Sequence, residues 1–328
     1  MASPTAPNNI VLYNYEFSPF GKRITTYLAL RGIDYAVCQQ PPTMPRPDLA
    51  LLPIAYRRIP ILALGRNIYL DTRLILRKLE TLFPSCPKLG ATNPQDLFVQ
   101  QLLQKYMIEG PVFGIAAGLV PLEVVRDPVF SADRQGMFGK TWSEEELREG
   151  RGECLSYVRG MFEWFEEGVL GDGRMWVVGG EGVGMTDIEA IWPFDFLTDM
   201  HLPPDLISPK QYPKVYAWLA RYRAAREQAS NLVPKPTVLD GQAAANCILG
   251  SELAETSNSV DEQDPLGLKQ GVEVEVYPAD WGSEYRDRGR LVGLSVDEVV
   301  IAVESKGEGK IWVHAPRTGF KIKEVGRK

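Results

Sequence analysis

The stretch LYNYEFSPFGKRITTYLALRGIDY, residues 12–35, contains the pattern that decides the fold. It begins within a short apolar strand expected at Asn9–Tyr13. After a turn it continues as a helix over Phe20–Arg31, whose apolar residues recur at helical spacing. Gly32 is expected to end this helix, because glycine adopts the left-handed conformation of helix ends without steric cost. With a second strand expected at Asp34–Gln39, the stretch predicts a βαβ unit.

The residues up to 88 complete a recognisable order of elements. A strand is expected at Ile59–Leu64, another at Asn67–Leu70, and a helix at Thr72–Leu82, which Pro84 closes. A βαβ unit followed by a ββα unit is the order of a thioredoxin-like sheet. Residues 1–88 are therefore predicted to form one thioredoxin-like domain.

Residues 89–235 are predicted to form an all-helical domain, because their apolar residues recur mostly at helical spacing. Thr141, with Glu144 three residues later, is expected to cap one of these helices. Residues 111–140 are richer in glycine and proline and predict no clear element. Helices are expected at Pro94–Ile108, Glu144–Leu170, Asp187–Met200 and Pro213–Gln228.

The composition changes again after the helical region. Residues 236–270 contain few large apolar side chains and are predicted to be a linker. Residues 271–328 alternate apolar and polar side chains in short runs, which indicates about five antiparallel strands in a small barrel or sandwich. Trp281, Trp312 and Phe320 are expected in its core. The chain is thus predicted to be an α+β multi-domain protein.

Bulk composition argues against several functions. The net charge of −6 disfavours a nucleic-acid-binding protein that works by bulk electrostatics. No apolar run approaches the roughly 20 residues of a membrane helix, and the polar N-terminus has no signal-peptide pattern. The four cysteines are scattered and only two histidines occur, so no metal site and no histidine-based triad are expected. A cytoplasmic protein with reduced thiols is predicted.

Three short motifs contain the candidate catalytic and ligand-binding residues: FSPFGKR at residues 17–23, RIPIL at 58–62 and LDT at 70–72. Together with the opening stretch, their order and spacing resemble the N-terminal domain of the glutathione S-transferase superfamily. The first motif is similar to that of serine-type members, especially the tau class, and in omega-type relatives a cysteine matches Ser18. The resemblance implies that glutathione is the co-substrate.

Ser18 is the residue that this resemblance assigns to catalysis. It precedes the first helix, and a helix N-terminus offers partial positive charge and free amide donors. A serine hydroxyl there would donate a hydrogen bond to the glutathione thiolate and lower the thiol pKa, which is about 8.5 in free cysteine. The alternative is that Ser18 only caps the helix.

The other two motifs supply the glutathione-binding residues that the resemblance implies. A cis bond before Pro60 would turn the backbone of Ile59 outward to pair with the cysteinyl backbone of glutathione. Asp71 and Thr72 stand where relatives usually have Glu-Ser, and would receive the γ-glutamyl group. Arg58 would meet the glycyl carboxylate. The alternatives are a strand-start proline, a helix cap and a surface arginine.

The resemblance also implies a cleft for a small hydrophobic electrophile. Tyr15 and Phe17 surround the serine turn, and Tyr106 and Phe113 lie where the first long helix of the second domain would face the cleft. These four are the candidate substrate-binding residues, although a core position is the better expectation for Phe113.

Three functions stay open at this point. The first is an enzyme that adds the glutathione thiolate to the electrophile, by conjugation or glutathione-assisted isomerisation, as in detoxification or secondary metabolism. The second is a non-catalytic binding or scaffold protein on the same fold. A thiol oxidoreductase is disfavoured, because Ser18 stands where a cysteine is needed. Relatives are usually homodimers, and the extra β domain resembles that of glutathione-transferase-like proteins of filamentous fungi.

Overall fold

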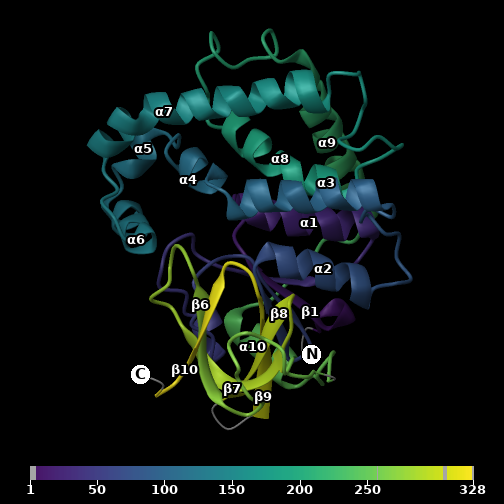
Figure 1. Cartoon of the computed structure of the whole chain (residues 1–328), viewed down its shortest axis with the longest axis vertical. Helices are drawn as coiled ribbons and strands as arrows, with labels where there is room; N and C mark the ends of the chain where they lie inside the picture. The colour runs from purple at the N-terminus through teal and green to yellow at the C-terminus, as the bar shows by residue number, and fades with distance from the viewer. Residues whose placement is uncertain (1–4, 257, 306–308, 327–328) are drawn as a thin grey trace.

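The computed structural model describes residues 5–256, 258–305 and 309–326 (Figure 1). The ten strands within these residues form one sheet, in the order β10-β6-β7-β8-β9-β4-β3-β1-β2-β5. Helices from the middle of the chain gather at one end of the molecule, and the C-terminal strands lie at the other (Figure 1). The strands are β1 Ile10–Asn14, β2 Ala36–Gln39, β3 Ile61–Leu64, β4 Asn67–Leu70, β5 Thr237–Val238, β6 Glu273–Pro278, β7 Asp287–Leu294, β8 Glu298–Ser305, β9 Gly309–Pro316 and β10 Phe320–Glu324.

The predicted thioredoxin-like unit is present at the N-terminus. β1 pairs in parallel with β2 and antiparallel with β3, and β4 pairs antiparallel with β3. Successive residues of a strand point to opposite faces, so Leu12 packs with the helices α1 (Pro19–Arg31) and α2 (Thr72–Leu82) in one core. Its neighbours Val11 and Tyr13 belong to a second core on the other face.

The segment expected as a linker builds part of that second core. Its helix α10 (Gly241–Leu249) buries Ala244 and Ile248 there, and β5 adds in parallel to the edge of β2. Residues 236–270 therefore carry more structure than a linker. The sequence did not predict this helix and strand, because their small side chains give a weak apolar pattern. Alanine nevertheless favours helices and packs closely in them.

The helical domain contains the expected long helices with shifted ends. Two of them finish in π-helical turns, and the uncertain stretch 111–140 folds as three short helices. The predicted cap at Thr141 is wrong: the Ser143 hydroxyl accepts from the Glu146 amide at 3.2 Å, because Ser143 directly precedes the first helical residue. The elements are α3 Pro94–Gln104, η3 Lys105–Glu109, α4 Val112–Ala117, α5 Leu122–Val125, α6 Pro128–Phe138, α7 Glu144–Glu163, η4 Trp164–Val169, α8 Met185–Thr198 and α9 Pro213–Leu232.

The five C-terminal strands are present and pair antiparallel, but they do not stand apart. β9 pairs in parallel with β4, which joins them to the N-terminal sheet. The fully buried Asn67 fixes this junction: its Oδ1 accepts from the Ala254 amide at 2.7 Å, and its Nδ2 lies 2.8 Å from Nε2 of His314 on β9. The extension is therefore continuous with the first domain.

The three aromatic residues expected in the C-terminal core have different environments. Phe320 is buried there, whereas Trp312 on β9 is half-exposed. Trp281 does not belong to this core: it follows the end of β6 and lines a cavity shared with the other two parts of the chain.

Candidate functional site

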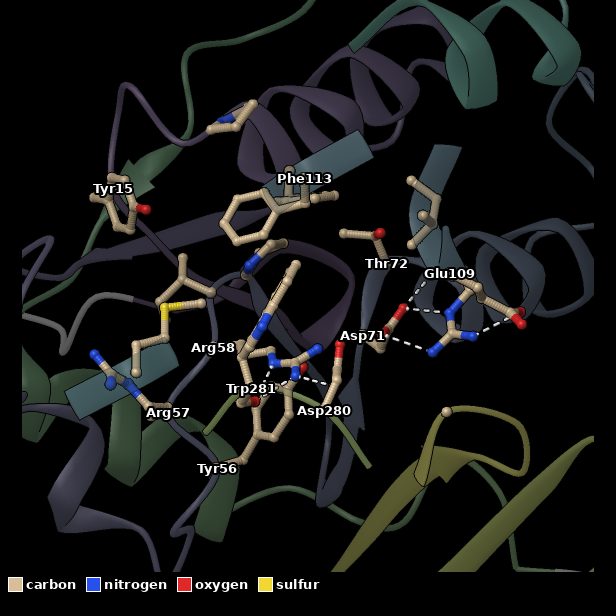
Figure 2. A pocket seen from close by; sticks show the side chains of 18 of the residues that line it. Tyr15, Tyr56, Arg57, Arg58, Asp71, Thr72, Glu109, Phe113, Asp280 and Trp281 are labelled. Atoms are coloured by element: carbon tan, nitrogen blue, oxygen red, sulfur yellow. Dashed lines mark hydrogen bonds and ion pairs between the residues drawn. The ribbon is translucent and has the colours of Figure 1, made fainter. Parts of the chain in front are cut away.

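A cavity of about 350 Å³ lies where the three parts of the chain meet. Small-molecule sites commonly measure roughly 300–1,000 Å³, so this volume suits a small ligand. Its walls come from the loops and strand ends of the thioredoxin-like unit, from residues 108–137 of the helical domain and from the segments beside β6 and β10 (Figure 2). The cavity is therefore the candidate functional site.

The backbone of Ile59 forms one wall of this cavity. The Ile59–Pro60 bond is cis, as the sequence motif implied, and β3 begins only at Ile61. Neither the N–H nor the C=O of Ile59 has a hydrogen-bond partner among the described residues. Because buried backbone polar groups are nearly always paired, this wall is suited to pair with the extended backbone of a ligand.

The start of α2 forms an acidic corner. Asp71 precedes the helix with φ +67°, and its Oδ1 accepts from the backbone amide of Arg73 at 3.0 Å. The Arg73 guanidinium pairs with Asp71 and, at 2.8 Å, with Glu109 (Figure 2). Burial alone would raise the pKa of Asp71, but the charge and hydrogen bonds of Arg73 outweigh it and lower that pKa to about 2. Asp71 is thus a carboxylate at neutral pH.

A basic corner lies on the other side of the cavity. Arg57 and Arg134 share a single carboxylate, that of Asp133. Arg46 is 5% exposed and donates to the carbonyls of Pro41 and Arg57, with no carboxylate ion pair among the described residues. Burial lowers the pKa of Arg46 to about 10. Three cations against one anion leave this corner with a positive charge that suits a carboxylate.

Arg58 lies between the two corners. Its guanidinium donates to the Asp280 carboxylate and to the Trp281 carbonyl, and Figure 2 shows Trp281 beside it. Arg58 therefore lines the cavity as expected, but the carboxylate it meets belongs to the chain itself.

Comparisons with known proteins agree with this architecture. The family described as glutathione S-transferase, N-terminal domain, matches residues 12–88. Residues 12–88 are therefore similar to the N-terminal domain of glutathione S-transferases. A second family, described only as a domain of unknown function, matches residues 115–231. A search of curated proteins found no match.

Solved structures show the same fold. A transferase-like protein from Pseudomonas syringae superposes with a TM-score of 0.69 at 22% identity, covering 96% of this chain and 98% of that one. Human glutathione S-transferase T1-1 in its apo form gives a TM-score of 0.51 at 13% identity, covering 74% of this chain and 99% of that one. The bacterial match extends over nearly all of this chain, so its fold is shared beyond the two standard domains.

Ser18, the predicted catalytic residue, does not line the cavity. Its side chain is 1% exposed, and its hydroxyl accepts from the Gly21 amide at 3.0 Å as the cap of α1. The neighbouring residues Pro19 and Phe20 line the cavity instead. The expectation of a hydroxyl open to ligand is corrected, because the turn folds the serine onto its own helix.

Replacing Ser18 by alanine tests which role matters. We expect the free energy of unfolding to fall by about 1 kcal/mol through loss of the cap. We also expect the rate of any glutathione-dependent turnover to stay within about threefold of wild type. Removing a hydrogen-bond donor that stabilises the reacting anion would instead lower the rate by about 10²-fold or more. Urea unfolding and initial-rate assays measure the two effects. A rate loss of that larger size would return the hydroxyl to catalysis.

The four predicted substrate-binding aromatics separate into two pairs. Tyr15 and Phe113 line the cavity. Phe17 is 60% exposed and packs on Tyr15 outside the lining. Tyr106 is also outside it, because its hydroxyl accepts from the Tyr157 hydroxyl at 2.8 Å within the helical domain. The structure therefore places Phe17 and Tyr106 outside the cavity lining, and their part in substrate binding stays a prediction.

Several lining residues were missed in the sequence. Arg46 lies in a proline-rich loop, Glu109 follows the end of the expected helix Pro94–Ile108, and Met137 lies in the stretch 111–140 for which no clear element was expected. One available signal was the surplus of basic residues before residue 84, which points to an anionic ligand. Trp281 carried no signal, because only the tertiary fold brings it to the cavity.

The described residues contain no group of three or more histidine, cysteine, aspartate or glutamate side chains placed to hold a metal ion. Their helices include none with the length and apolarity needed to cross a membrane.

Proposed function

We propose that this chain binds glutathione in the cavity and adds its thiolate to a small hydrophobic electrophile, by conjugation or glutathione-assisted isomerisation. The observation that carries the proposal is the unpaired backbone of Ile59, with an acidic corner on one side and a basic corner on the other. A peptide ligand with a charged group at each end matches this order.

The charges of glutathione fit the two corners in one orientation. Its γ-glutamyl end carries an ammonium and a carboxylate, which match Asp71, Glu109 and the Arg73 between them. Its glycyl end carries a lone carboxylate, which matches the basic corner around Arg46. The reverse orientation would bring the ammonium against three arginines and is disfavoured by repulsion.

The thiolate would then lie near the first turn of α1. Phe20 lines the cavity, and its backbone N–H has no partner among the described residues. A free amide at a helix N-terminus stabilises an adjacent anion. In this proposal the backbone donor at Phe20, rather than the Ser18 hydroxyl, lowers the thiol pKa.

Calorimetric titration with glutathione tests the proposal. Wild type is expected to bind, and Asp71→Asn to bind about 30-fold or more weakly, since it removes one charge of a partly buried pair. Asparagine keeps the helix-cap acceptor and tolerates the left-handed φ of position 71. Arg134→Met, at the basic corner, is also expected to weaken binding, because it removes a positive charge that faces the glycyl carboxylate.

Arg77→Met is the matched control, because Arg77 lies on α2 with a 41% exposed side chain that pairs with Asp297 outside the cavity. It is expected to bind as wild type does. Absence of binding by wild type, or equal losses in Arg77→Met and Asp71→Asn, would contradict the proposal. Binding without turnover of any electrophile would favour the non-catalytic alternative. The homodimer and the cytoplasmic location remain predictions from the sequence.

A further inference from the structure

The segment that follows β6 is fixed across one side of the cavity by three different parts of the chain. The Ala279 amide donates to the Gly319 carbonyl at 2.9 Å, beside the start of β10. The Gly282 amide donates to the Met137 carbonyl of α6 at 3.0 Å. Between them, Arg58 holds Asp280 and the Trp281 carbonyl. Trp281 is therefore held in place before any ligand arrives.

The indole of Trp281 completes an aromatic wall. Its centroid lies 5.1 Å from that of Phe113, which lies 5.4 Å from that of Phe20. All three line the cavity, and Met137 lines it as well. The wall thus combines aromatic faces from α1, α4 and the C-terminal extension, as Figure 2 shows for Phe113 and Trp281.

The helical domain is shaped to admit this indole. A Cβ added at Gly114 on α4 would lie 3.3 Å from Cζ2 of Trp281, closer than ordinary van der Waals contact. On its other edge the indole meets Phe138 with centroids 5.1 Å apart and planes at 81°. These contacts fix the ring plane, so the side chain presents one orientation to a ligand.

We propose that Trp281 determines specificity for flat aromatic electrophiles, and that this is what the C-terminal strands contribute to the site. The inference rests on the proposed function for its reactive step. Aromatic faces favour offset stacking with other flat rings, and the thioether of Met137 adds a contact that also suits ring edges. An aliphatic electrophile gains little from such a wall.

A reaction that fits is attack on 1-chloro-2,4-dinitrobenzene. The glutathione thiolate forms a C–S bond at the ring carbon, chloride leaves with the electron pair of the C–Cl bond, and the thiol proton passes to solvent. No oxidant or further co-reactant is needed. The ring would lie against Trp281 while the sulfur approaches from the first turn of α1.

The test uses 1,3-dinitrobenzene, which has the same flat ring but no leaving group, so that binding is measured without turnover. Calorimetry on the full chain, without glutathione, is expected to detect binding to wild type. Affinity should fall about 5–10-fold in Trp281→Leu and about twofold or less in Trp281→Phe, because phenylalanine keeps an aromatic face. Trp312→Leu, a half-exposed tryptophan on β9 outside the cavity, should bind as wild type does.

The outcomes separate this inference from the proposed function. No binding by wild type, equal affinity in Trp281→Leu, or an equal loss in Trp312→Leu overturns the role of Trp281. Trp281-dependent binding with no glutathione binding overturns the proposed function and leaves the aromatic site standing. Circular dichroism of each variant checks folding, and the Trp281→Phe result decides the question if Trp281→Leu fails to fold.

Discussion

Replacing Arg23 by methionine is expected to lower the free energy of unfolding by about 3–5 kcal/mol, the cost of leaving one partner of a buried ion pair behind. Arg23 on α1 pairs with Glu189 on α8, and both side chains are 1% exposed. The Gln104 side chain donates to the second oxygen of Glu189 at 3.0 Å. Burial raises the pKa of Glu189, which the Arg23 charge offsets in part. Without Arg23 this carboxyl has to take up a proton or remain charged in the core.

The double variant Arg23→Met, Glu189→Leu is expected to recover most of that loss, because a buried pair replaced by apolar side chains is often close to neutral. Arg77→Met removes an exposed ion pair and should cost less than about 1 kcal/mol. Urea unfolding of wild type, of the single variants Arg23→Met and Glu189→Leu, and of the double variant gives the coupling energy between the two residues. A double variant as unstable as the sum of its single variants would show that the two residues act independently.

This pair also connects the core to the site. The Arg23 guanidinium donates to the Thr72 hydroxyl, and Thr72 lines the cavity at the start of α2. The domain interface and the acidic corner of the cavity therefore share one arginine. We expect Arg23→Met to weaken glutathione binding as well as stability, since the start of α2 loses its contact with α1.

The local parts of the fold were predictable because local patterns decide them. α1 and α2 follow from helical spacing of apolar residues, and the cis bond before Pro60 was implied by a short motif. Both depend on residues close together in the chain. The same holds for the five C-terminal strands, whose alternating side chains reflect a pleated, half-buried surface.

What the sequence did not reveal depends on long-range contacts. The parallel pairing of β4 with β9 joins residues far apart in the chain, and no local pattern specifies such a partner. The placement of Trp281 follows from that pairing and from the Arg58 contacts. Burial of Ser18 has a different origin: a capping serine and a ligand-facing serine look the same in sequence, and only the rotation of the side chain separates them.

Asp287→Asn is expected to stabilise the protein at alkaline pH. Asp287 begins β7, is 2% exposed, and accepts from the Ala55 amide at 2.6 Å through Oδ1. Its Oδ2 has no hydrogen-bond partner among the described residues. Burial raises its pKa from 3.8 to about 7, an effect that the amide hydrogen bond offsets only in part. The folded protein therefore holds the proton of this carboxyl more tightly than the unfolded chain does.

The sign of the pH dependence follows from that difference. The contribution of Asp287 to stability is fully present below the unfolded pKa of 3.8 and is lost as pH rises through about 7. Asparagine keeps an acceptor for Ala55 and never becomes charged. Its advantage over aspartate should therefore grow by about 2 kcal/mol between pH 5.5 and pH 8, at roughly 1.4 kcal/mol for each pKa unit crossed.

Unfolding free energies at the two pH values measure this change, with Asp297→Asn as the control, because Asp297 has a 66% exposed side chain. An Asp287→Asn effect of the same size at both pH values would contradict the assigned pKa. Ala55 precedes Tyr56 and Ile59, which line the cavity. The carboxyl of Asp287 thus ties the loop that carries the proposed peptide-binding wall to the C-terminal strands, and a charge there would weaken that connection as the pH rises.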